Sequence, residues 1–193
     1  MAEDKMIPSH IVIVGGSAGS LEVILTLLGN LDPALNLTLI IVLHRKSSYD
    51  SSLAELLADK TSWQIKEVEE KDPVLPRHVY LAPGDYHLLI ERTHSFSLDV
   101  SEKVNYSRPS IDISFESAAE IYGTALTGIL LSGANADGVE GLRKIKQYGG
   151  TCIVQDPATA EVSYMPQEGI DHAPVDHIIE GSRMAEFLNQ LFG

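Results

Sequence analysis

The chain has 193 residues and a formal charge of −13, from 14 lysines and arginines against 27 aspartates and glutamates. Hydrophobic residues make up 44% of it and charged residues 21%, which is typical of a globular protein with one sizeable core. The negative charge disfavours binding to nucleic-acid phosphates, because like charges repel. No apolar run approaches the roughly 18 residues that a membrane span needs. We therefore expect neither a nucleic-acid partner nor direct insertion into a membrane.

The first ten residues, MAEDKMIPSH, are polar and contain acids, unlike a secretory signal. Cys152 is the only cysteine, so no disulfide can form within the chain, and its apolar surroundings favour a buried, reduced thiol. These features predict a cytoplasmic protein. We expect no cofactor and no metal, since His172 and His177 lie five residues apart around a proline with no cysteine nearby.

Strand-like and helix-like segments alternate along the whole chain. In chain order they are a strand at His10–Val14, a helix at Leu21–Leu28, a strand at Leu37–Leu43, a helix at Ser51–Ala58, hairpin-like segments within Pro76–Val100, a helix at Ile111–Tyr122, a strand at Ala125–Leu131, a helix at Val139–Tyr148, a strand at Thr151–Val154 and a helix at Met184–Phe192. Strands that are apolar on both faces are typical of a parallel sheet covered by helices. We predict a doubly wound α/β fold with a mainly parallel sheet and an antiparallel hairpin at one edge. No repeat or linker interrupts the pattern, so residues 1–193 are predicted to form a single domain.

Three of the predicted strands end near a residue with chemical potential. Ser17 follows IVIV, His44 directly follows LTLIIVL, and Asp137 comes after LTGILLSGANA. Loops at the carboxyl ends of parallel strands meet in one crevice, so these side chains can lie together. A hydroxyl, an imidazole that takes its proton and a carboxylate that orients the imidazole are the minimal set for nucleophilic ester hydrolysis. The pattern predicts Ser17 as nucleophile, His44 as general base and Asp137 as the orienting carboxylate.

Each of these residues also has a simpler interpretation. Ser17 lies in G-x-S-x-G between a strand and a helix, the setting of a nucleophile, but it could instead cap the helix or belong to a phosphate-binding loop. A histidine at a strand end is often structural. Asp137 could cap the helix that follows it. Asp156, after TCIVQ, is the rival carboxylate for His44.

Several ordered stretches resemble the catalytic domain of the chemotaxis protein-glutamate methylesterases, the CheB-type family, over nearly the whole chain. They are IVIVGGSAGS, IVLHR, VYLAPGDYHLLIE, SRPSIDISFESAA, GILLSGANADGVEGLRKIKQYGGTCIVQD and the Met-Pro of SYMPQ. The resemblance implies a Ser–His–Asp triad at Ser17, His44 and Asp137. It also implies that the substrates are glutamyl methyl esters on chemoreceptors, with methanol and a carboxylate as products. Some members of the family also deamidate glutamines, and the resemblance implies a role in chemotaxis or related signal transduction.

The sequence departs from the family pattern at three positions. Ala18 replaces a usual threonine, Ala134 a usual methionine and Pro157 a usual glutamate. The backbone amides of Ala18 and Ala134 remain candidate donors to an oxyanion, although the methionine side chain that helps shape the pocket in the family is missing at Ala134. Arg108, in SRPSID, is a candidate residue of the substrate cleft, with a structural ion pair as the alternative.

Family members commonly carry a receiver domain that responds to phosphorylation. Here the first predicted strand begins near His10, so we expect a catalytic domain alone, either a stand-alone protein or an excised domain, with the first favoured. One rival hypothesis is a signalling module of the same fold that has lost turnover. Another is a phosphate- or nucleotide-binding protein that uses GGSAGS, although that loop has no lysine.

The net charge bears on any protein partner. A charge of −13 predicts slow encounter with an acidic partner, and salt would screen that repulsion. A local basic face would reverse this expectation. Arg45, Lys46 and Arg108 are the residues expected to form such a face beside His44.

Overall fold

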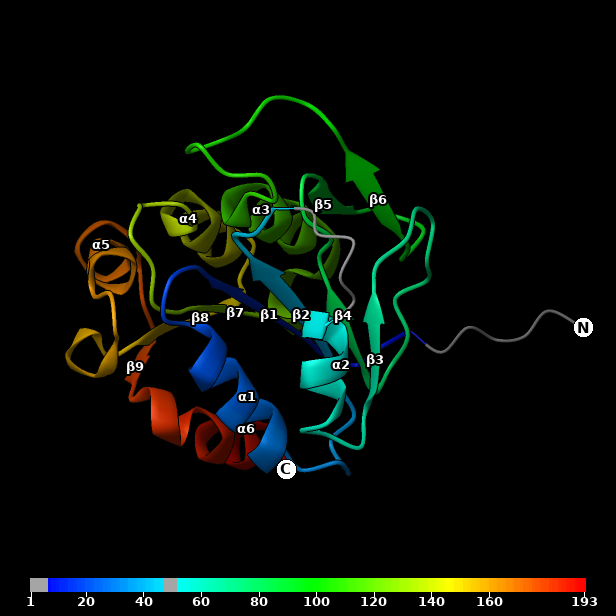
Figure 1. Cartoon of the computed structure of the whole chain (residues 1–193), viewed down its shortest axis with the longest axis horizontal. Helices are drawn as coiled ribbons and strands as arrows, with labels where there is room; N and C mark the ends of the chain where they lie inside the picture. Colours follow the sequence, from blue (N-terminus) through cyan, green and yellow to red (C-terminus); the bar gives the residue numbers. More distant parts are fainter. Residues whose placement is uncertain (1–6, 47–51) are drawn as a thin grey trace, which may run out of the picture.

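Two fully buried strands, β1 (Ile11–Gly16) and β2 (Thr38–Leu43), lie side by side in the middle of the fold. The computed structural model describes residues 7–46 and 52–193. In that part of the chain, seven strands form one sheet in the order β3-β4-β2-β1-β7-β8-β9 (Figure 1). Every pair in this sheet is parallel. The predicted fold class, a doubly wound α/β fold with a mainly parallel sheet, is confirmed.

The element bounds follow the hydrophobic pattern closely. The remaining strands are β3 (Gln64–Glu67), β4 (His78–Leu81), β5 (His87–Ile90), β6 (Phe96–Asp99), β7 (Leu126–Leu130), β8 (Thr151–Gln155) and β9 (His177–Ile179). The helices are α1 (Leu21–Asn30), α2 (Ser52–Ala58), α3 (Ile111–Tyr122), α4 (Val139–Gln147), α5 (Tyr164–His172) and α6 (Met184–Phe192), with short 3₁₀ turns η1 (Gly123–Ala125), η2 (Pro157–Thr159) and η3 (Gly181–Arg183). Helices α3 and α6 have the predicted bounds. Ser51, the first residue of one predicted helix, lies outside the described residues.

The region from 76 to 100 divides between two sheets. β5 and β6 pair antiparallel as a two-stranded sheet of their own, which is the expected hairpin. β4, from the same region, instead joins the main sheet as a parallel neighbour of β2. The reason is burial, because Val79, Tyr80 and Leu81 are all nearly inaccessible to solvent and so need cover on both faces.

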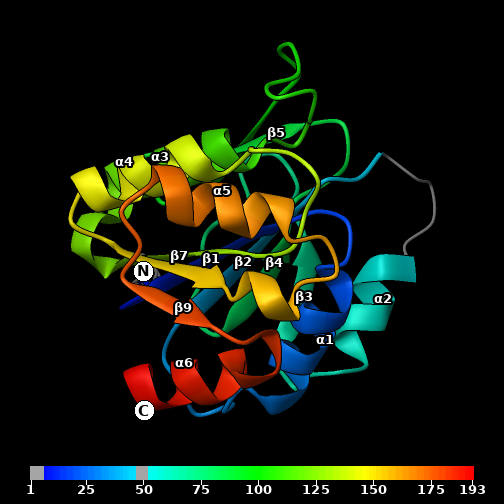
Figure 2. The same ribbon diagram turned by 90° about the vertical axis from the view of Figure 1, so that its left-hand side faces the viewer.

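Side chains that alternate along the strands fill two separate hydrophobic cores. Ile11 and Ile13 of β1 pack with Phe115 on the face covered by α3, α4 and α5. Val12 and Val14 pack on the opposite face, which α1 and α6 cover. Figure 2 shows the sheet edge-on between these two helical layers. Full burial of each such aliphatic or aromatic side chain contributes roughly 1.5–3 kcal/mol.

The sheet order determines where the functional loops lie. β1 is the neighbour of both β2 and β7, and all three run in the same direction. The loops that follow them carry Ser17, His44 and Asp137 and therefore leave the sheet at one edge. No helix in residues 7–46 or 52–193 is long and apolar enough to cross a membrane.

Candidate active site

Ser17 occupies the turn between β1 and α1. Its amide donates to the carbonyl of Ser132 at 2.9 Å, and the Ser20 hydroxyl donates to the Ser17 carbonyl at 2.7 Å. Gly19, with φ of +79°, carries the tight part of the turn, and an added Cβ there would lie 2.8 Å from Ser132 Oγ. Ser17 itself has no positive φ, so its turn lacks the backbone strain of many nucleophile turns. Its hydroxyl makes no hydrogen bond to any described residue, so it does not cap α1.

His44 follows β2 directly. Its amide donates to the Gly16 carbonyl at 3.2 Å, so Ser17 and His44 follow hydrogen-bonded ends of neighbouring strands. His44 Nε2 lies 2.7 Å from Asp137 Oδ2, and the His44 side chain is 11% exposed. His44 Nδ1 faces Ser107 Oγ at 3.3 Å and has no hydrogen bond with Ser17. Because Asp137 occupies Nε2, Nδ1 is the nitrogen left to accept a proton.

Asp137 is fully buried and accepts hydrogen bonds from several donors. These are His44 Nε2 (2.7 Å), Ile111 N (2.6 Å), Ser110 Oγ (2.9 Å), Asp112 N (3.1 Å) and Asn105 Nδ2 (3.1 Å). Burial alone would raise the pKa of Asp137, but the hydrogen bonds from His44 and from the first amides of α3 outweigh it, so its pKa is lowered. Asp137 is therefore an anion that holds the Nε2–H tautomer of His44.

A second carboxylate, Asp112, lies beside Asp137. Asp112 Oδ1 accepts from the amides of Gly138 and Gly141, at 2.9 and 2.7 Å, where α4 begins. Asn105 Nδ2 bridges the two side chains, at 2.8 Å from Asp112 Oδ2 and 3.1 Å from Asp137 Oδ1. Burial, followed by the charge of Asp137, raises the pKa of Asp112 to about 6. Asp112, and not Asp137, therefore caps the helix that follows Asp137.

Asp112 and Ser107 are two site residues that the sequence reasoning did not assign. Both lie in SRPSID, the stretch from which only Arg108 was selected. A serine in a polar loop and an acid in the first turn of a helix carry no local signal of contact with a triad. Only the packing of residues 107–112 against the loop after β7 brings them to His44 and Asp137.

Two backbone amides beside Ser17 are unused. Neither Ala18 N nor Ala134 N donates a hydrogen bond to any described residue, whereas Gly133 N is bonded to the Val162 carbonyl at 3.1 Å. A Cβ built on Gly133 would lie 3.1 Å from Ser17 Cβ, so the loop after β7 lies against the serine. Both alanines are exposed. Two free N–H donors, one on the residue after Ser17 and one in the loop that lies against it, fit the stabilisation of an oxyanion.

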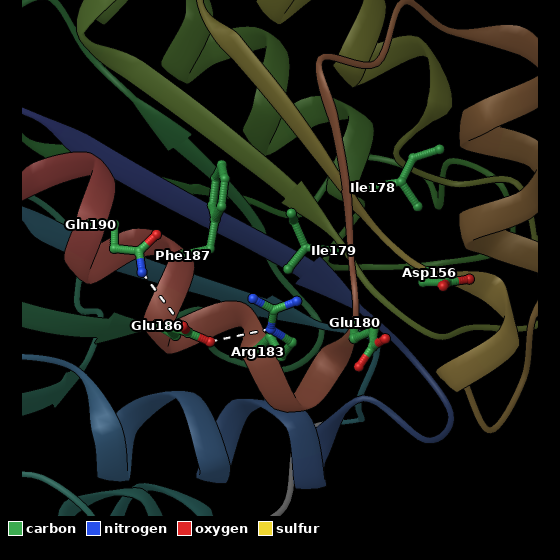
Figure 3. A pocket seen from close by; sticks show the side chains of 8 residues that line it. All are labelled: Asp156, Ile178, Ile179, Glu180, Arg183, Glu186, Phe187 and Gln190. Carbon is green, nitrogen blue, oxygen red and sulfur yellow. Dashed lines mark hydrogen bonds and ion pairs between the residues drawn. The ribbon is translucent and has the colours of Figure 1, made fainter.

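The rival carboxylate Asp156 lies in a different pocket, of about 210 Å³ (Figure 3). Its Oδ1 accepts from Ala158 N at 2.9 Å, which caps η2. In the same pocket Arg183 Nε pairs with Glu186 at 3.2 Å. The structure thus brings Asp137, and not Asp156, to His44.

Arg108 lines a cavity next to His44. Its Nη1 donates to the carbonyls of Val100 and Ser101 at 3.0 and 2.8 Å, and it forms no ion pair with a described residue. The structural role of Arg108 is therefore to bind backbone carbonyls of its own loop, and not to form the ion pair that was the alternative. No group of three or more histidine, cysteine, aspartate or glutamate side chains in the described chain is arranged to hold a metal ion.

A serine, a histidine and a buried carboxylate at adjacent strand ends of a parallel α/β sheet form the arrangement that serine hydrolases use. Relatives of known name match this chain along most of its length. A family profile for CheB methylesterase matches residues 12–188. A Leptospira interrogans relative, named as an inferred protein-glutamate methylesterase/protein-glutamine glutaminase, is 41% identical over 180 residues, 93% of this chain and 93% of the relative.

Thermotoga maritima supplies both a sequence and a structure for comparison. Its protein-glutamate methylesterase/protein-glutamine glutaminase is 33% identical over 188 residues, which are 96% of this chain and 55% of that protein. This chain therefore spans about half the length of that relative. The crystal structure of the Thermotoga maritima CheB methylesterase catalytic domain matches with a TM-score of 0.91 at 33% identity, over 96% of this chain and 100% of the other. The chain belongs to the CheB methylesterase family, a family of hydrolases.

Proposed function

We propose that this chain hydrolyses glutamyl methyl esters on a methylated chemoreceptor or a related signalling protein, with Ser17 as nucleophile. The observation that carries the proposal is the bond between His44 Nε2 and the buried Asp137, which leaves Nδ1 as the base at the strand end beside Ser17. The names of the relatives supply the substrate class, since both are named protein-glutamate methylesterases.

The geometry supports a two-step acyl transfer. His44 Nδ1 takes the proton of the Ser17 hydroxyl as Oγ attacks the ester carbonyl, and the amides of Ala18 and Ala134 stabilise the oxyanion. His44 then gives that proton to the departing methoxide, which leaves as methanol. Water repeats the sequence on the acyl-serine, releasing the glutamate side chain and restoring Ser17.

The contact between His44 Nδ1 and the Ser107 hydroxyl must break before the first step. His44 Nδ1 faces Ser107 Oγ at 3.3 Å, which is long for a hydrogen bond to a hydroxyl and correspondingly weak. Catalytic hydrogen bonds are often incomplete in a free enzyme and form when substrate binds. In the proposed mechanism, the Ser17 hydroxyl replaces the Ser107 hydroxyl as the partner of His44 Nδ1 when substrate binds.

Glutamine deamidation is a second candidate activity of the same site. The names of the Leptospira and Thermotoga relatives include a protein-glutamine glutaminase. The chemistry differs only in the leaving group, since His44 would protonate a departing amine and release ammonia instead of methanol.

Methanol release from a methylated chemoreceptor fragment tests the proposal. Wild type should release methanol, and Ser17→Ala should be slower by at least about a thousandfold, because triad members act as a unit. Ser182→Ala, which removes an exposed hydroxyl in η3, is the matched control and should resemble wild type. A folded wild type that releases no methanol would support the rival signalling module. Retention of more than about a tenth of the activity by Ser17→Ala would reject the nucleophile.

A further inference from the structure

A cavity of about 290 Å³ opens directly beside the imidazole of His44. We call it the basic pocket, and its lining residues are His44, Arg45, Lys46, Asp85, Lys103, Tyr106, Ser107 and Arg108. It contains both the candidate base and the hydroxyl that contacts it. Ser17 does not line the pocket, but the His44 amide is hydrogen-bonded to the carbonyl of Gly16, the residue before Ser17, so the pocket lies next to the strand end that carries the nucleophile.

The charge of the basic pocket opposes that of the whole molecule. Four of the chain's 14 lysines and arginines line it, beside a single carboxylate, Asp85. Arg45 is partly neutralised by Glu67, at 2.7 Å on the outer side. With Asp85 and Glu67 both counted as negative, the four basic residues still make the pocket positive, in a chain whose formal charge is −13. A positive concavity beside low-dielectric walls focuses the field on an incoming anion.

Donors in the basic pocket remain available. Neither Lys46 nor Lys103 forms an ion pair with a described residue, and both are exposed. Arg108 uses only Nη1 for its loop carbonyls. Within the described chain, the Nε atoms of Arg45 and Arg108 also have no hydrogen-bond partner, but both are buried and so are not among the donors open to solvent. Among the described residues, the positive charge of Lys46, Lys103 and Arg108 is therefore not paired with a carboxylate.

The loop that forms the outer wall has an unusual backbone. Asn105 and Tyr106 follow one another with φ of +50° and +63°, a conformation that costs non-glycine residues free energy. The result is that the Tyr106 side chain stands 96% exposed at the mouth of the pocket. The loop, between β6 and α3, projects from the body of the protein at the top of Figure 1. An exposed aromatic ring beside cations is a surface suited to contact with another protein.

We propose that the basic pocket binds a carboxylate of the substrate protein, on an acidic side chain close to the esterified glutamate. This inference rests on the proposed function and adds a determinant of substrate choice to it. The ester itself is neutral, so its docking charge must come from neighbouring side chains. On a substrate helix, those three or four residues away lie within about 5–6 Å of the ester side chain.

The pocket should act on encounter and binding more than on chemistry. Solvent-exposed charges at the rim of an interface mainly change the association rate and its dependence on salt. An acidic substrate should therefore have a lower KM, with little difference in kcat. The pocket also reverses the effect expected from net charge, so added salt should slow the reaction on an acidic substrate.

Three peptides of one sequence test the proposal. Each carries one glutamyl methyl ester, with glutamate, glutamine or phosphoserine at the positions three and four residues away. Wild type should show a kcat/KM between about three- and tenfold higher for the glutamate peptide than for the glutamine peptide, through KM. In Lys46→Gln/Lys103→Gln that ratio should fall close to one. Salt near 1 M should abolish it in wild type.

The matched control is Lys60→Gln/Arg92→Gln, which changes the net charge equally at two exposed positions outside the basic pocket. It should keep the wild-type ratio. An equal loss in this control, or an unchanged ratio in the pocket variant, would overturn the proposal, as would a wild type without preference. A clear preference for the phosphoserine peptide would overturn the assignment of a carboxylate.

Binding to Ser17→Ala protein, measured by fluorescence anisotropy with the same peptides, separates this inference from the proposed function. Preference for the glutamate peptide in binding, without methanol release by wild type, would reject the methylesterase activity and retain the pocket. Methanol release without any charge preference would reject the pocket and retain the activity.

Discussion

Asp112 and Asp137 each accept hydrogen bonds from the first turn of a helix, in a crossed arrangement. Each aspartate binds the N-terminus of the helix that the other one belongs to or precedes. Asp137, which precedes α4, binds the amides of Ile111 and Asp112 where α3 begins. Asp112, in α3, binds the amides of Gly138 and Gly141 where α4 begins. Each helix N-terminus favours the negative charge that it receives. The carboxylate that orients His44 is therefore fixed by the packing of α3 against α4.

The burial of Asp112 beside the charge of Asp137 predicts how the free energy of unfolding depends on pH. The pKa of Asp112 is raised to about 6 in the folded protein, from 3.8, so folding favours its protonated form. The stabilisation from this group is complete below about pH 4 and is lost as pH rises through 6. Asp112→Asn cannot titrate. The free energy of unfolding of wild type should therefore fall, relative to Asp112→Asn, by on the order of 2 kcal/mol between pH 4 and 7.

Urea unfolding of both proteins at several pH values measures this difference, since contributions from other titrating groups cancel. Asp59→Asn, at an exposed position after α2, is the control and should run parallel to wild type. Parallel curves for Asp112→Asn and wild type would show that Asp112 does not titrate in this range.

Asp137→Asn should affect both turnover and stability. The amide no longer favours the Nε2–H tautomer, so kcat should fall by about 10³- to 10⁴-fold. Its NH₂ group would also face buried N–H donors such as that of Ile111, which costs about 1–3 kcal/mol. Turnover is measured where circular dichroism shows a folded variant. Asp156→Asn, in the other pocket, should stay within a few-fold of wild type, and the reverse ranking would transfer the orienting role to Asp156.

Ser107→Ala should keep activity within about tenfold of wild type. Ser107 Oγ is the hydroxyl that contacts His44 Nδ1 in the free protein, but the unused amides of Ala18 and Ala134 lie beside Ser17. Attack needs oxyanion donors as well as a base, so Ser17 is the productive hydroxyl. Steady-state hydrolysis of a small neutral ester compares the two alanine variants. A loss for Ser107→Ala as large as that for Ser17→Ala would contradict this assignment.

Much of the fold could be predicted because the hydrophobic pattern of this chain is strong. α3 spans Ile111–Tyr122 as predicted, since its apolar residues recur at helical spacing and Ser110 and Gly123 flank it. The pattern could not separate β4 from the hairpin, because burial of a short strand depends on its neighbours in the sheet. β3, with the sequence QIKE, and β9, with three residues, were not expected, because edge strands this polar or short carry no periodic signal.

The residues of the candidate site also fall into those that the sequence could predict and those that it could not. Ser17, His44 and Asp137 could be selected because each follows a buried strand, and strand ends of a parallel sheet converge. The contacts of Ser107 and Asp112 could not be predicted, because they depend on how residues 107–112 pack against the segment after β7. The three residues expected to form a basic face, Arg45, Lys46 and Arg108, all line the basic pocket, and Lys103, from the same loop as Arg108, lines it too.

The most direct test of the triad is covalent labelling with a fluorophosphonate, with the modified residue identified by mass spectrometry of the digested protein. In wild type the adduct should form on Ser17, because the unused amides of Ala18 and Ala134 are next to that serine and we propose His44 as its base. In His44→Ala, labelling should be at least about a hundredfold slower, since the hydroxyl stays protonated. An adduct on Ser107, or equal labelling of Ser17 with and without His44, would contradict the mechanism.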